Sequence, residues 1–421
     1  MTKSPIRVAH VSAYSDRGAG RTAKRIVDAI QAADEDATFT HEFFAFDSVG
    51  APRRFFHRTL VQLTRSIIRI TWPELSNPFS FPIFATGIGR RIRSGGFDLV
   101  HLHWIGDYSL SLFDLRNLQV PVLWTLHDQW PILAIEHVHG GTAFNQDWEA
   151  EYFGSERRSR RRREVLIRTK FELYPANLHF IAPSHWIKER AKNSTYARKI
   201  RTSLIQNPID TNWWKPVAGT LDSGTLDLPR TEVLLLFSAK EGLNDDNKGG
   251  SEALELSKFI AQNFPEKRVT LAVVGGRKCR YEIENLDVIG LGVVADDEIL
   301  RFLYSLADVT LVPSKVDNFP SVILESMACG TPVGALDDFG PSEMICDGKN
   351  GFLSKSVQGL GHKIVSFLNS DQSVQRGVAQ ECVDSCQKRW GLQKIGGEYL
   401  RVYAEALRLR PPLEAQIPPL A

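Results

Sequence analysis

The first half of the chain alternates short apolar runs with stretches in which apolar residues recur at helical spacing. The apolar runs are typical of buried β-strands and cover residues 6–11, 40–46, 97–103, 120–126, 178–182 and 200–205. The helical patterns lie near residues 21–32, 55–70, 156–173 and 184–192. This alternation predicts an α/β fold, in which a parallel sheet carries helices on both faces.

The second half of the chain starts the same pattern again. Its apolar runs cover residues 233–238, 269–275, 288–290, 309–313, 333–336 and 352–353. Residues 215–230 are rich in glycine, proline and threonine and predict a linker between two domains. An amphipathic helix is predicted near residues 392–409. We therefore expect an N-terminal domain, a C-terminal domain, a closing helix and a loose tail, at residues 1–214, 231–388, 389–410 and 411–421.

Composition narrows the class of protein without naming a function. The 421 residues carry a formal net charge of +2, so the chain shows no global signal for binding nucleic acid. The five cysteines form no CxxC pair and fit reduced thiols better than a disulfide framework. No apolar run approaches the roughly 18 residues that a membrane span needs. We expect a cytoplasmic protein.

The segment from residue 311 to residue 353 carries the most chemistry. Asp317 follows a predicted strand, and Glu325 lies on the short helix predicted at residues 321–329. Ligands bind at this edge of an open parallel sheet. A carboxylate there accepts hydrogen bonds from the paired hydroxyls of a ribose or a hexose. In the alternative interpretation, Asp317 caps the helix and Glu325 is an ordinary solvated residue.

This segment resembles the donor-binding signature of the retaining glycosyltransferases of family 4. The shared pieces are an acid, seven further residues, a second acid and the run SMACGTPV at residues 326–333. Asp317 stands where the family at large has glutamate. The resemblance implies that Asp317 contacts the donor sugar and that Glu325 holds the ribose hydroxyls. Asn318, Phe319 and Ser321 then belong to the same donor site.

The resemblance also implies the GT-B architecture. In that fold, two doubly wound Rossmann-like domains face each other across a cleft, and the C-terminal helix returns to the N-terminal domain. Family 4 enzymes transfer a sugar from a nucleotide-sugar donor, with retention of configuration and without a divalent metal. We therefore expect no cofactor and no metal, and a saccharide or lipid-linked acceptor, as in cell-surface polysaccharide assembly.

Positive charge and glycine-rich turns mark the expected diphosphate site. Lys248 ends a polar loop just before a predicted helix, where free backbone N–H groups and the helix dipole favour an anion. The family's usual arginine in this loop is absent, and Lys240 is a candidate substitute. Gly18, Gly20 and Gly275 follow other strands and are placed to bring backbone N–H groups to the nucleotide. The alternative for Lys248 is an ordinary solvated lysine.

Histidines gather at the ends of two neighbouring predicted strands. His101, His103 and His127 lie in the motifs VHLHW and WTLHDQWP, and Asp128 follows directly. Such a cluster could ligate zinc, which would make the protein a zinc-dependent hydrolase. A buried structural role for His101 and a helix cap for Asp128 form the simpler alternative.

Both motifs resemble one branch of the family 4 enzymes. The resemblance implies that His127 lies near the transferred sugar and that Asp128 orients His127 or the acceptor. His103, Trp104 and Trp130 are further candidates on the acceptor side, where an indole ring can stack on a sugar. With Lys248 and Asp317, His127 and Asp128 make up the predicted catalytic residues. Two other functions stay open: a non-catalytic nucleotide-sugar-binding protein and a nucleotide-sugar epimerase.

Basic residues are interleaved with large apolar ones in two stretches of the first half. Residues 53–93 hold eight arginines and one acid, and residues 156–168, ERRSRRRREVLIR, form a second basic block. Cationic patches beside aromatic residues dock on anionic membranes. We therefore hypothesise a peripheral position on the inner face of the cell membrane. In the alternative, the helix packs its apolar stripe on the core and its arginines are solvated.

Overall fold

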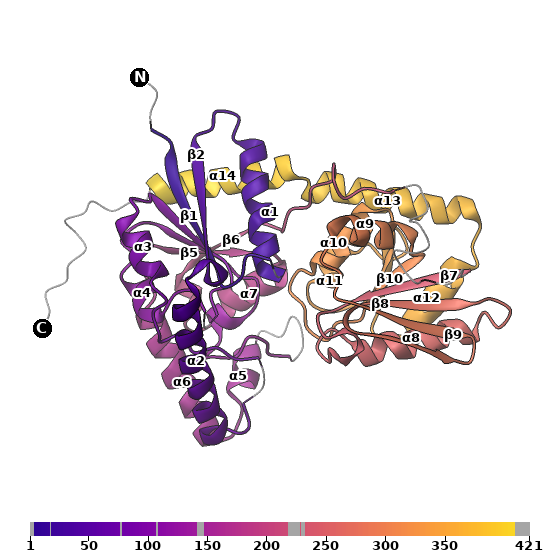
Figure 1. The fold of residues 1–421 in the computed structure, drawn as a ribbon, viewed down its shortest axis with the longest axis horizontal. Helices are drawn as coiled ribbons and strands as arrows, with labels where there is room; N and C mark the ends of the chain where they lie inside the picture. Colours follow the sequence, from indigo (N-terminus) through magenta and orange to yellow (C-terminus); the bar gives the residue numbers. More distant parts are fainter. Residues whose placement is uncertain are drawn as a thin grey trace, which may run out of the picture. The chain divides into compact units, whose positions relative to one another are not determined.

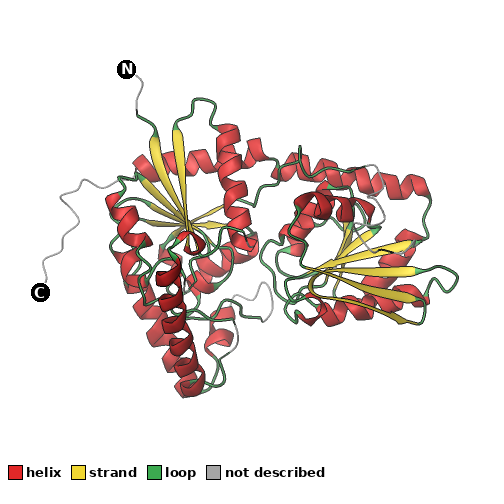
Figure 2. Ribbon diagram, viewed as in Figure 1, coloured by secondary structure: helices red, strands yellow, loops and turns green. Residues whose placement is uncertain are grey.

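The structure, a computed structural model, describes residues 4–16, 18–75, 78–106, 108–140, 147–217, 228 and 232–408. The predicted tail at residues 411–421 and most of the predicted linker lie outside these residues. The chain divides into two compact units. Unit 1 comprises Met1–Pro208 and Leu392–Ala421, and unit 2 comprises Ile209–Gly391. Each unit contains one sheet flanked by helices, so the predicted α/β fold is confirmed (Figures 1 and 2).

Unit 1 contains a six-stranded parallel sheet in the order β2-β1-β3-β4-β5-β6. The strands are β1 (Ile6–Ser12), β2 (Phe39–Ala45), β3 (Leu99–Leu102), β4 (Val122–Thr125), β5 (Leu178–Ala182) and β6 (Arg201–Leu204). The chain leaves β1 toward one edge of the sheet and returns through β3 on the other side. This reversal of strand order is a topological switch point, where open α/β sheets bind ligands.

The helices of unit 1 are α1 (Gly18–Ala33), α2 (Ala51–Thr71), α3 (Ile88–Ser94), α4 (Leu112–Arg116), α5 (Trp148–Phe153), α6 (Arg157–Glu172), α7 (His185–Asn193) and α14 (Leu392–Arg408). Helix α14 packs against α1, which confirms that the last helix returns to the N-terminal unit (Figure 1). A Cβ atom on Gly396 would lie 1.9 Å from the carbonyl oxygen of Ala29, so only glycine permits this approach.

Unit 2 contains a second six-stranded sheet, in the order β12-β11-β10-β7-β8-β9. Its strands are β7 (Val233–Ser238), β8 (Val269–Ile283), β9 (Leu286–Gly292), β10 (Val309–Val312), β11 (Val333–Leu336) and β12 (Gly351–Ser354). Its helices are α8 (Gly250–Gln262), α9 (Asp297–Leu306), α10 (Ser321–Ala328), α11 (Pro341–Met344), α12 (Val357–Leu368) and α13 (Gln372–Trp390). The switch point of this sheet lies between β7 and β10.

Strand β8 runs beyond the predicted end at residue 275. At Gly275 and Gly276 the backbone adopts positive φ angles of 99° and 65°, and the chain turns back. The residues before this turn pair with β9 in parallel, and residues 279–283 pair with β9 in the opposite direction. The apolar pattern missed this extension because its residues are polar and mostly exposed.

Candidate active site

In unit 2, two loops meet at the carboxyl ends of β7 and β10. The backbone N–H of Lys315 donates to the carbonyl of Asn247 at 2.9 Å, and the Asn247 side-chain amide donates to the carbonyl of Val316 at 3.1 Å. Lys248 Nζ lies 2.5 Å from Asp317 Oδ2, although 69 residues separate the two. The predicted cation and the first predicted acid therefore share one site, at the switch point of the sheet.

The Lys248–Asp317 pair is partly open to solvent, with side-chain exposures of 38% and 12%. Burial by itself lowers the pKa of Lys248, but the charge and hydrogen bond of Asp317 outweigh it and raise that pKa. Lys248 is therefore a permanent cation at neutral pH. Gly249 has a φ of +77°, and a Cβ atom there would lie 2.1 Å from the Pro313 carbonyl oxygen. This close approach of the two loops brings the lysine to the acid.

Glu325 lies on α10 with 6% of its surface exposed. It accepts a hydrogen bond from the Tyr304 hydroxyl at 3.1 Å. Burial, reinforced by the Glu325 charge, raises the pKa of Tyr304, so this hydroxyl stays a donor. Residue Pro320 is the N-cap of α10 and no side chain caps this helix, so Asp317 is not a cap and Glu325 is not a solvated residue.

The other residues predicted for the donor site divide into two groups. Ser321 is half-buried at the first position of α10. Asn318 and Phe319 are each 5% exposed, and the Phe319 ring packs edge-on against Trp390, 6.1 Å between centroids. The structure therefore contradicts a direct donor contact by the Phe319 side chain, because apolar burial holds this ring in the core. A Cβ atom on Gly340 would lie 1.7 Å from the Asn318 carbonyl oxygen, a close approach that the sequence pattern did not reveal.

Lys240 and Gly275 also differ in placement. The Lys240 side chain is 77% exposed and pairs with Glu241 at 3.1 Å, so it does not join the Lys248–Asp317 pair. Gly275 lies against the loop after β7, and a Cβ atom there would be 1.8 Å from the Ala239 carbonyl oxygen. Beside this turn, a pocket of about 260 Å³ is lined by Gly275, Arg277, Tyr281 and residues of that loop.

In unit 1, the turn after β1 leads directly into α1. Helix α1 begins at Gly18, which has a φ of +23° and open space around its Cβ position. A Cβ atom on Gly20 would lie 1.9 Å from the Tyr14 carbonyl oxygen, so this position requires glycine. The N-terminus of α1 therefore stands at the switch point of the first sheet, as an anion site requires.

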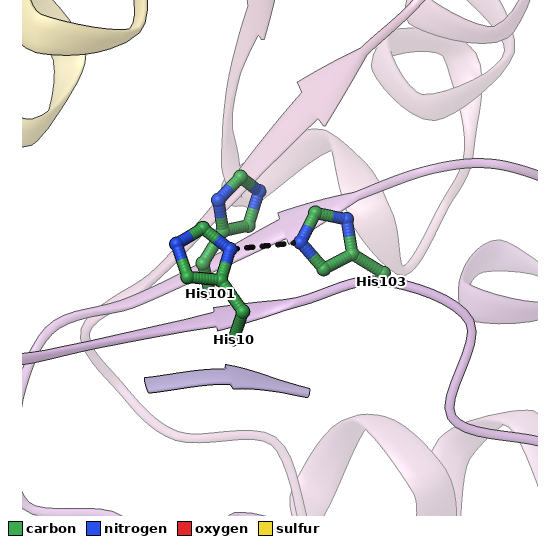
Figure 3. A group of neighbouring side chains, drawn as sticks. All are labelled: His10, His101 and His103. Carbon is green, nitrogen blue, oxygen red and sulfur yellow. Dashed lines mark hydrogen bonds between the residues drawn. The ribbon is translucent and has the colours of Figure 1, made fainter. Parts of the chain in front are cut away.

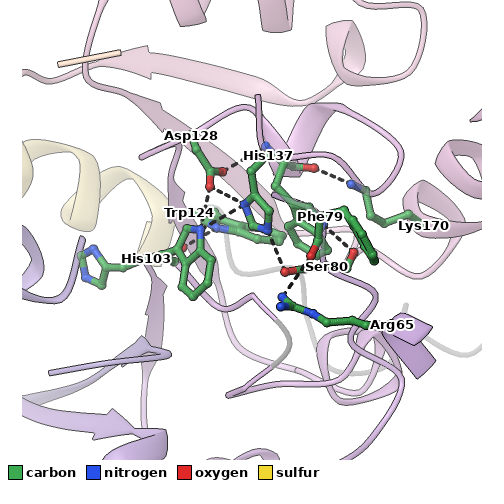
Figure 4. Close-up of polar contacts among 10 residues, drawn as sticks. Arg65, Phe79, Ser80, His103, Trp124, Asp128, His137 and Lys170 are labelled. Carbon is green, nitrogen blue, oxygen red and sulfur yellow. Dashed lines mark hydrogen bonds and ion pairs between the residues drawn. The ribbon is translucent and has the colours of Figure 1, made fainter. Parts of the chain in front are cut away.

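Asp128 accepts hydrogen bonds from three groups, and His127 is not one of them. Its Oδ2 lies 2.5 Å from His137 Nδ1 (Figure 4) and 2.6 Å from Trp104 Nε1, and its Oδ1 accepts from the Trp130 backbone N–H at 3.0 Å. His137 in turn contacts the Ser80 hydroxyl at 2.7 Å. Among the described residues, Asp128 thus orients Trp104 and His137, which corrects the expectation that it orients His127.

Two predicted acceptor residues lie in the core instead. Trp130 is 2% exposed and donates to the Ser80 carbonyl at 3.0 Å, and the Lys170 ammonium lies 4.2 Å from the centre of its ring. This burial contradicts stacking of Trp130 on a sugar. His103 is 1% exposed, and its two ring nitrogens contact His10 and His127, each at 3.1 Å. His103 therefore has no nitrogen left for an acceptor. Trp104 is half-buried and stays a candidate for the acceptor side.

The histidines close enough to share a metal ion differ from the predicted set of His101, His103 and His127. Ring nitrogens of His10, His101 and His103 lie within 4.8 Å of one another, whereas His127 is not in this group (Figure 3). The nitrogens of His101 contact the hydroxyls of Tyr403 and Thr125, each at 2.8 Å. Both ring nitrogens of His101 thus have hydroxyl partners, and a metal would have to displace one of them, so the contacts favour a hydrogen-bonded cluster.

Two family models match this chain. The family described as Glycosyltransferase Family 4 matches residues 17–213, and the family described as Glycosyl transferases group 1 matches residues 242–380. The chain belongs to the family 4 and group 1 glycosyltransferases. The predicted family is thus confirmed on both halves of the chain.

Curated relatives match this chain over only part of their own length. The D-inositol 3-phosphate glycosyltransferase of Thermomonospora curvata is 30% identical over 36% of this chain and 39% of its own. The N-acetyl-alpha-D-glucosaminyl L-malate synthase of Bacillus anthracis is 28% identical over 25% of this chain and 28% of its own. The chain thus spans about two fifths or less of the length of these two relatives.

Solved structures match over nearly the whole chain. Sucrose-phosphate synthase from Thermosynechococcus elongatus has a TM-score of 0.61 at 18% identity, over 96% of this chain and 99% of the other. Anabaena HepE in complex with UDP-glucose has a TM-score of 0.57 at 16% identity, over 95% of this chain and 100% of the other. At such identities the likeness shows the fold alone, and the predicted GT-B class is confirmed.

Proposed function

We propose that this glycosyltransferase moves a sugar from a nucleoside-diphosphate donor to a saccharide or lipid-linked acceptor, with retention and without a metal ion. The observation that carries the proposal is the contact between Lys248 and Asp317 at the switch point of the second sheet, with Glu325 on the adjoining helix. A cation for a diphosphate and carboxylates for sugar hydroxyls are the groups that such a donor needs. The HepE complexes with UDP and UDP-glucose support a donor of this class.

Each of these groups has a separate task in the proposal. Lys248 neutralises the negative charge that develops on the diphosphate as the glycosidic bond breaks, and one such preorganised donor is typically worth about 3 kcal/mol. Asp317 fixes the ammonium and accepts from a sugar hydroxyl. Glu325, held by Tyr304, accepts from the ribose hydroxyls. The acceptor attacks from the face that the diphosphate leaves, and a donor phosphate oxygen takes the acceptor's proton.

In this proposal, His127 contacts the transferred sugar and Trp104 contacts the acceptor. Burial lowers the pKa of His127 to about 4, and the nearby Asp128 carboxylate opposes this only in part. His127 is therefore neutral at pH 7 and can direct a hydrogen bond at a sugar oxygen without competing for the diphosphate. The half-buried Trp104 ring, held by Asp128, is the candidate surface for stacking on the acceptor.

A donor screen tests the proposal directly. The full chain is titrated with UDP, GDP and ADP by calorimetry and then incubated with the matching sugar nucleotides and short saccharide acceptors. Mass spectrometry identifies the products. We expect binding of at least one nucleoside diphosphate and a glycosylated acceptor. Binding without any product would favour the non-catalytic binding protein, an isomerised donor would favour the epimerase, and the absence of all binding would contradict the proposal.

We further propose a peripheral membrane face on α2. No helix within the described part of the chain is both long and apolar enough to cross a bilayer. Only His57 and Val61 are buried on α2. Five large apolar side chains of this helix are more than half exposed: Phe55, Phe56, Leu63, Ile67 and Ile70. The core therefore covers only a narrow stripe of α2, and most of its apolar surface is left for another partner.

A groove beside this helix has the chemistry of an anionic lipid. It holds about 730 Å³ between α2 and α6, with apolar walls from Ile68, Trp72 and Leu166. Its lining also holds one acid, Glu156, and four arginines: Arg157, Arg158, Arg161 and Arg162. Apolar walls combined with this excess of positive charge fit the hydrocarbon chain and phosphate head of a lipid.

Vesicle sedimentation tests this membrane face. We expect the full chain to sediment with vesicles that contain phosphatidylglycerol and much less with phosphatidylcholine alone. Ile67→Glu should abolish sedimentation, because it places a charge on the exposed apolar stripe. Val374→Glu, at an exposed valine of unit 2, is the matched control and should sediment like the parent. Equal sedimentation of the two variants would contradict the proposal.

A further inference from the structure

Four histidines of unit 1 are hydrogen-bonded in series across four neighbouring strands of the sheet. His10 Nε2 lies 3.0 Å from His41 Nδ1, and His10 Nδ1 lies 3.1 Å from His103 Nε2 (Figure 3 shows the second contact). His103 Nδ1 lies 3.1 Å from His127 Nε2. These rings, from β2, β1 and the segments after β3 and β4, are here called the histidine network (His41, His10, His103, His127). The strand order β2-β1-β3-β4 sets their sequence in space.

All four rings of the histidine network are neutral at pH 7. Burial lowers the pKa values of His41 and His127 to about 4, and burial with neighbouring imidazoles lowers those of His10 and His103 well below the ordinary value. A neutral imidazole has one N–H donor and one lone pair. Each contact therefore needs a donor on one side and an acceptor on the other. It follows that all three hydrogen bonds point the same way along the series.

The far end of the series sets that direction. His41 Nε2 is buried and has no hydrogen-bond partner. A buried N–H without an acceptor is rarer in proteins than an acceptor atom without a donor. The proton of His41 therefore sits on Nδ1 and is donated to His10, which donates to His103, which donates to His127 Nε2. This order leaves the His127 proton on Nδ1, and among the described residues that nitrogen has no other partner.

We propose that His41, His10 and His103 are positioning residues, which hold His127 in the tautomer that presents an Nδ1–H donor to a sugar oxygen. The role of His127 toward the sugar rests on the proposed function, whereas its tautomer does not. The three positioning residues never touch the substrate. They act because reversing His127 requires reversing every hydrogen bond behind it and leaves a buried N–H unpaired at His41.

Nitrogen NMR of the full chain, labelled with ¹⁵N-histidine and free of substrate, tests the tautomer. We expect His127 to be protonated on Nδ1 and bare on Nε2. His10→Phe interrupts the series and should produce a measurable population of His127 with its proton on Nε2. His101→Phe is the matched control, because His101 lies 4.3 Å from His103 between ring centroids but bonds hydroxyl groups instead. It should leave the His127 spectrum as in the parent.

The half-buried His41 provides a second variant if His10→Phe fails to fold. His41→Phe removes the donor at the end of the series and should shift the His127 tautomer in the same direction. A parent His127 with its proton on Nε2, or no change in both variants, would overturn the proposal, as would bound zinc in the purified chain. In turnover, His41→Phe should lower kcat about tenfold with little change in the donor KM. The spectra need no turnover, so failure of the proposed function is seen separately.

Discussion

The carboxyl edges of the two sheets are built from opposite kinds of polar group. In unit 2, the edge gathers charges, with the Lys248 ammonium against the Asp317 carboxylate in a partly open site. In unit 1, the edge carries the imidazoles of His103 and His127, which burial keeps neutral. The same position in the same topology therefore holds either an ion pair or neutral side chains joined by directed hydrogen bonds. The first edge suits a charged diphosphate, and the second suits an uncharged sugar.

The energetic cost of each edge explains this difference. A pair of opposite charges tolerates partial burial because each partner compensates the other, and a phosphate can replace the carboxylate contact. A buried histidine can stay uncharged, so a row of imidazoles costs less to bury than a row of ions. The histidine network therefore needs no counter-charge. The direction of its hydrogen bonds determines which nitrogen of His127 carries the proton.

Removal of the cation from the charged edge should have the largest effect. Lys248→Met deletes the ammonium and leaves Asp317 without its partner. We expect sugar transfer to fall about 100- to 1,000-fold in kcat, as for the loss of one preorganised charge-stabilising donor. Steady-state kinetics with the donor found in the screen measures the change. Lys258→Met, at an exposed lysine of α8, removes the same charge elsewhere in unit 2 and should keep the parent rate. A fall of equal size in both variants would contradict the proposal that Lys248 stabilises the leaving diphosphate.

Neutralising the second acid should have a smaller effect. Glu325→Gln keeps the shape of the side chain but weakens the hydrogen bonds that it accepts from ribose hydroxyls. Bonds to a charged group are worth about 1.5–3 kcal/mol, so the affinity for the nucleoside diphosphate should fall about 10- to 100-fold. Calorimetry with the nucleotide measures this loss. An unchanged affinity would show that Glu325 does not contact the ribose.

Acid should destabilise the neutral edge selectively. Seven histidines of unit 1 have lowered pKa values: His10, His41, His101, His103, His127, His139 and His179. Below about pH 6.5 these histidines bind protons in the unfolded chain but stay neutral in the folded unit, down to about pH 4 for His41, His127, His139 and His179. Their contribution to stability is therefore fully present above pH 6.5 and is lost as the pH falls.

Each such histidine should lower the free energy of unfolding by up to about 1.4 kcal/mol per pH unit in this window. Hydrogen exchange at pH 7.5, 6.5 and 5.5 separates the two units. Amides of the strands of unit 1 should lose protection faster with falling pH than those of unit 2, after correction for intrinsic exchange. Equal losses in both units would contradict the contrast between a charged edge and a neutral one.

The smallest effect is expected from removing the Tyr304 hydroxyl, which donates to Glu325. Tyr304→Phe removes one donor to Glu325 and leaves the ring in the core. A single such bond contributes about 0.5–1.5 kcal/mol net, and somewhat more when the acceptor is charged, so nucleotide affinity should fall about threefold to tenfold. The same calorimetric titration detects this change. A Tyr304→Phe effect larger than that of Glu325→Gln would mean that the hydroxyl itself contacts the ligand.

Much of the fold can be predicted from the local pattern of apolar and polar residues. The predicted strands at residues 178–182, 233–238 and 333–336 match β5, β7 and β11 residue for residue. The second acid was placed on a helix, and Glu325 lies on α10. These features were accessible because burial acts on each segment separately, and alternation of apolar and polar residues records it. Helix α13 was missed because its polar sequence carries only a narrow apolar stripe.

Tertiary structure alone decided which side chains meet. Strand order brings Lys248 to Asp317 across 69 residues, and it lines up His41, His10, His103 and His127 from four separate segments. Burial of Trp130 was equally invisible, because an aromatic residue in a motif suits a core and a sugar site alike. By itself, the sequence determined the strands, the α/β class and the family signature. Contacts between distant segments depend on the order of the strands, which no local pattern records.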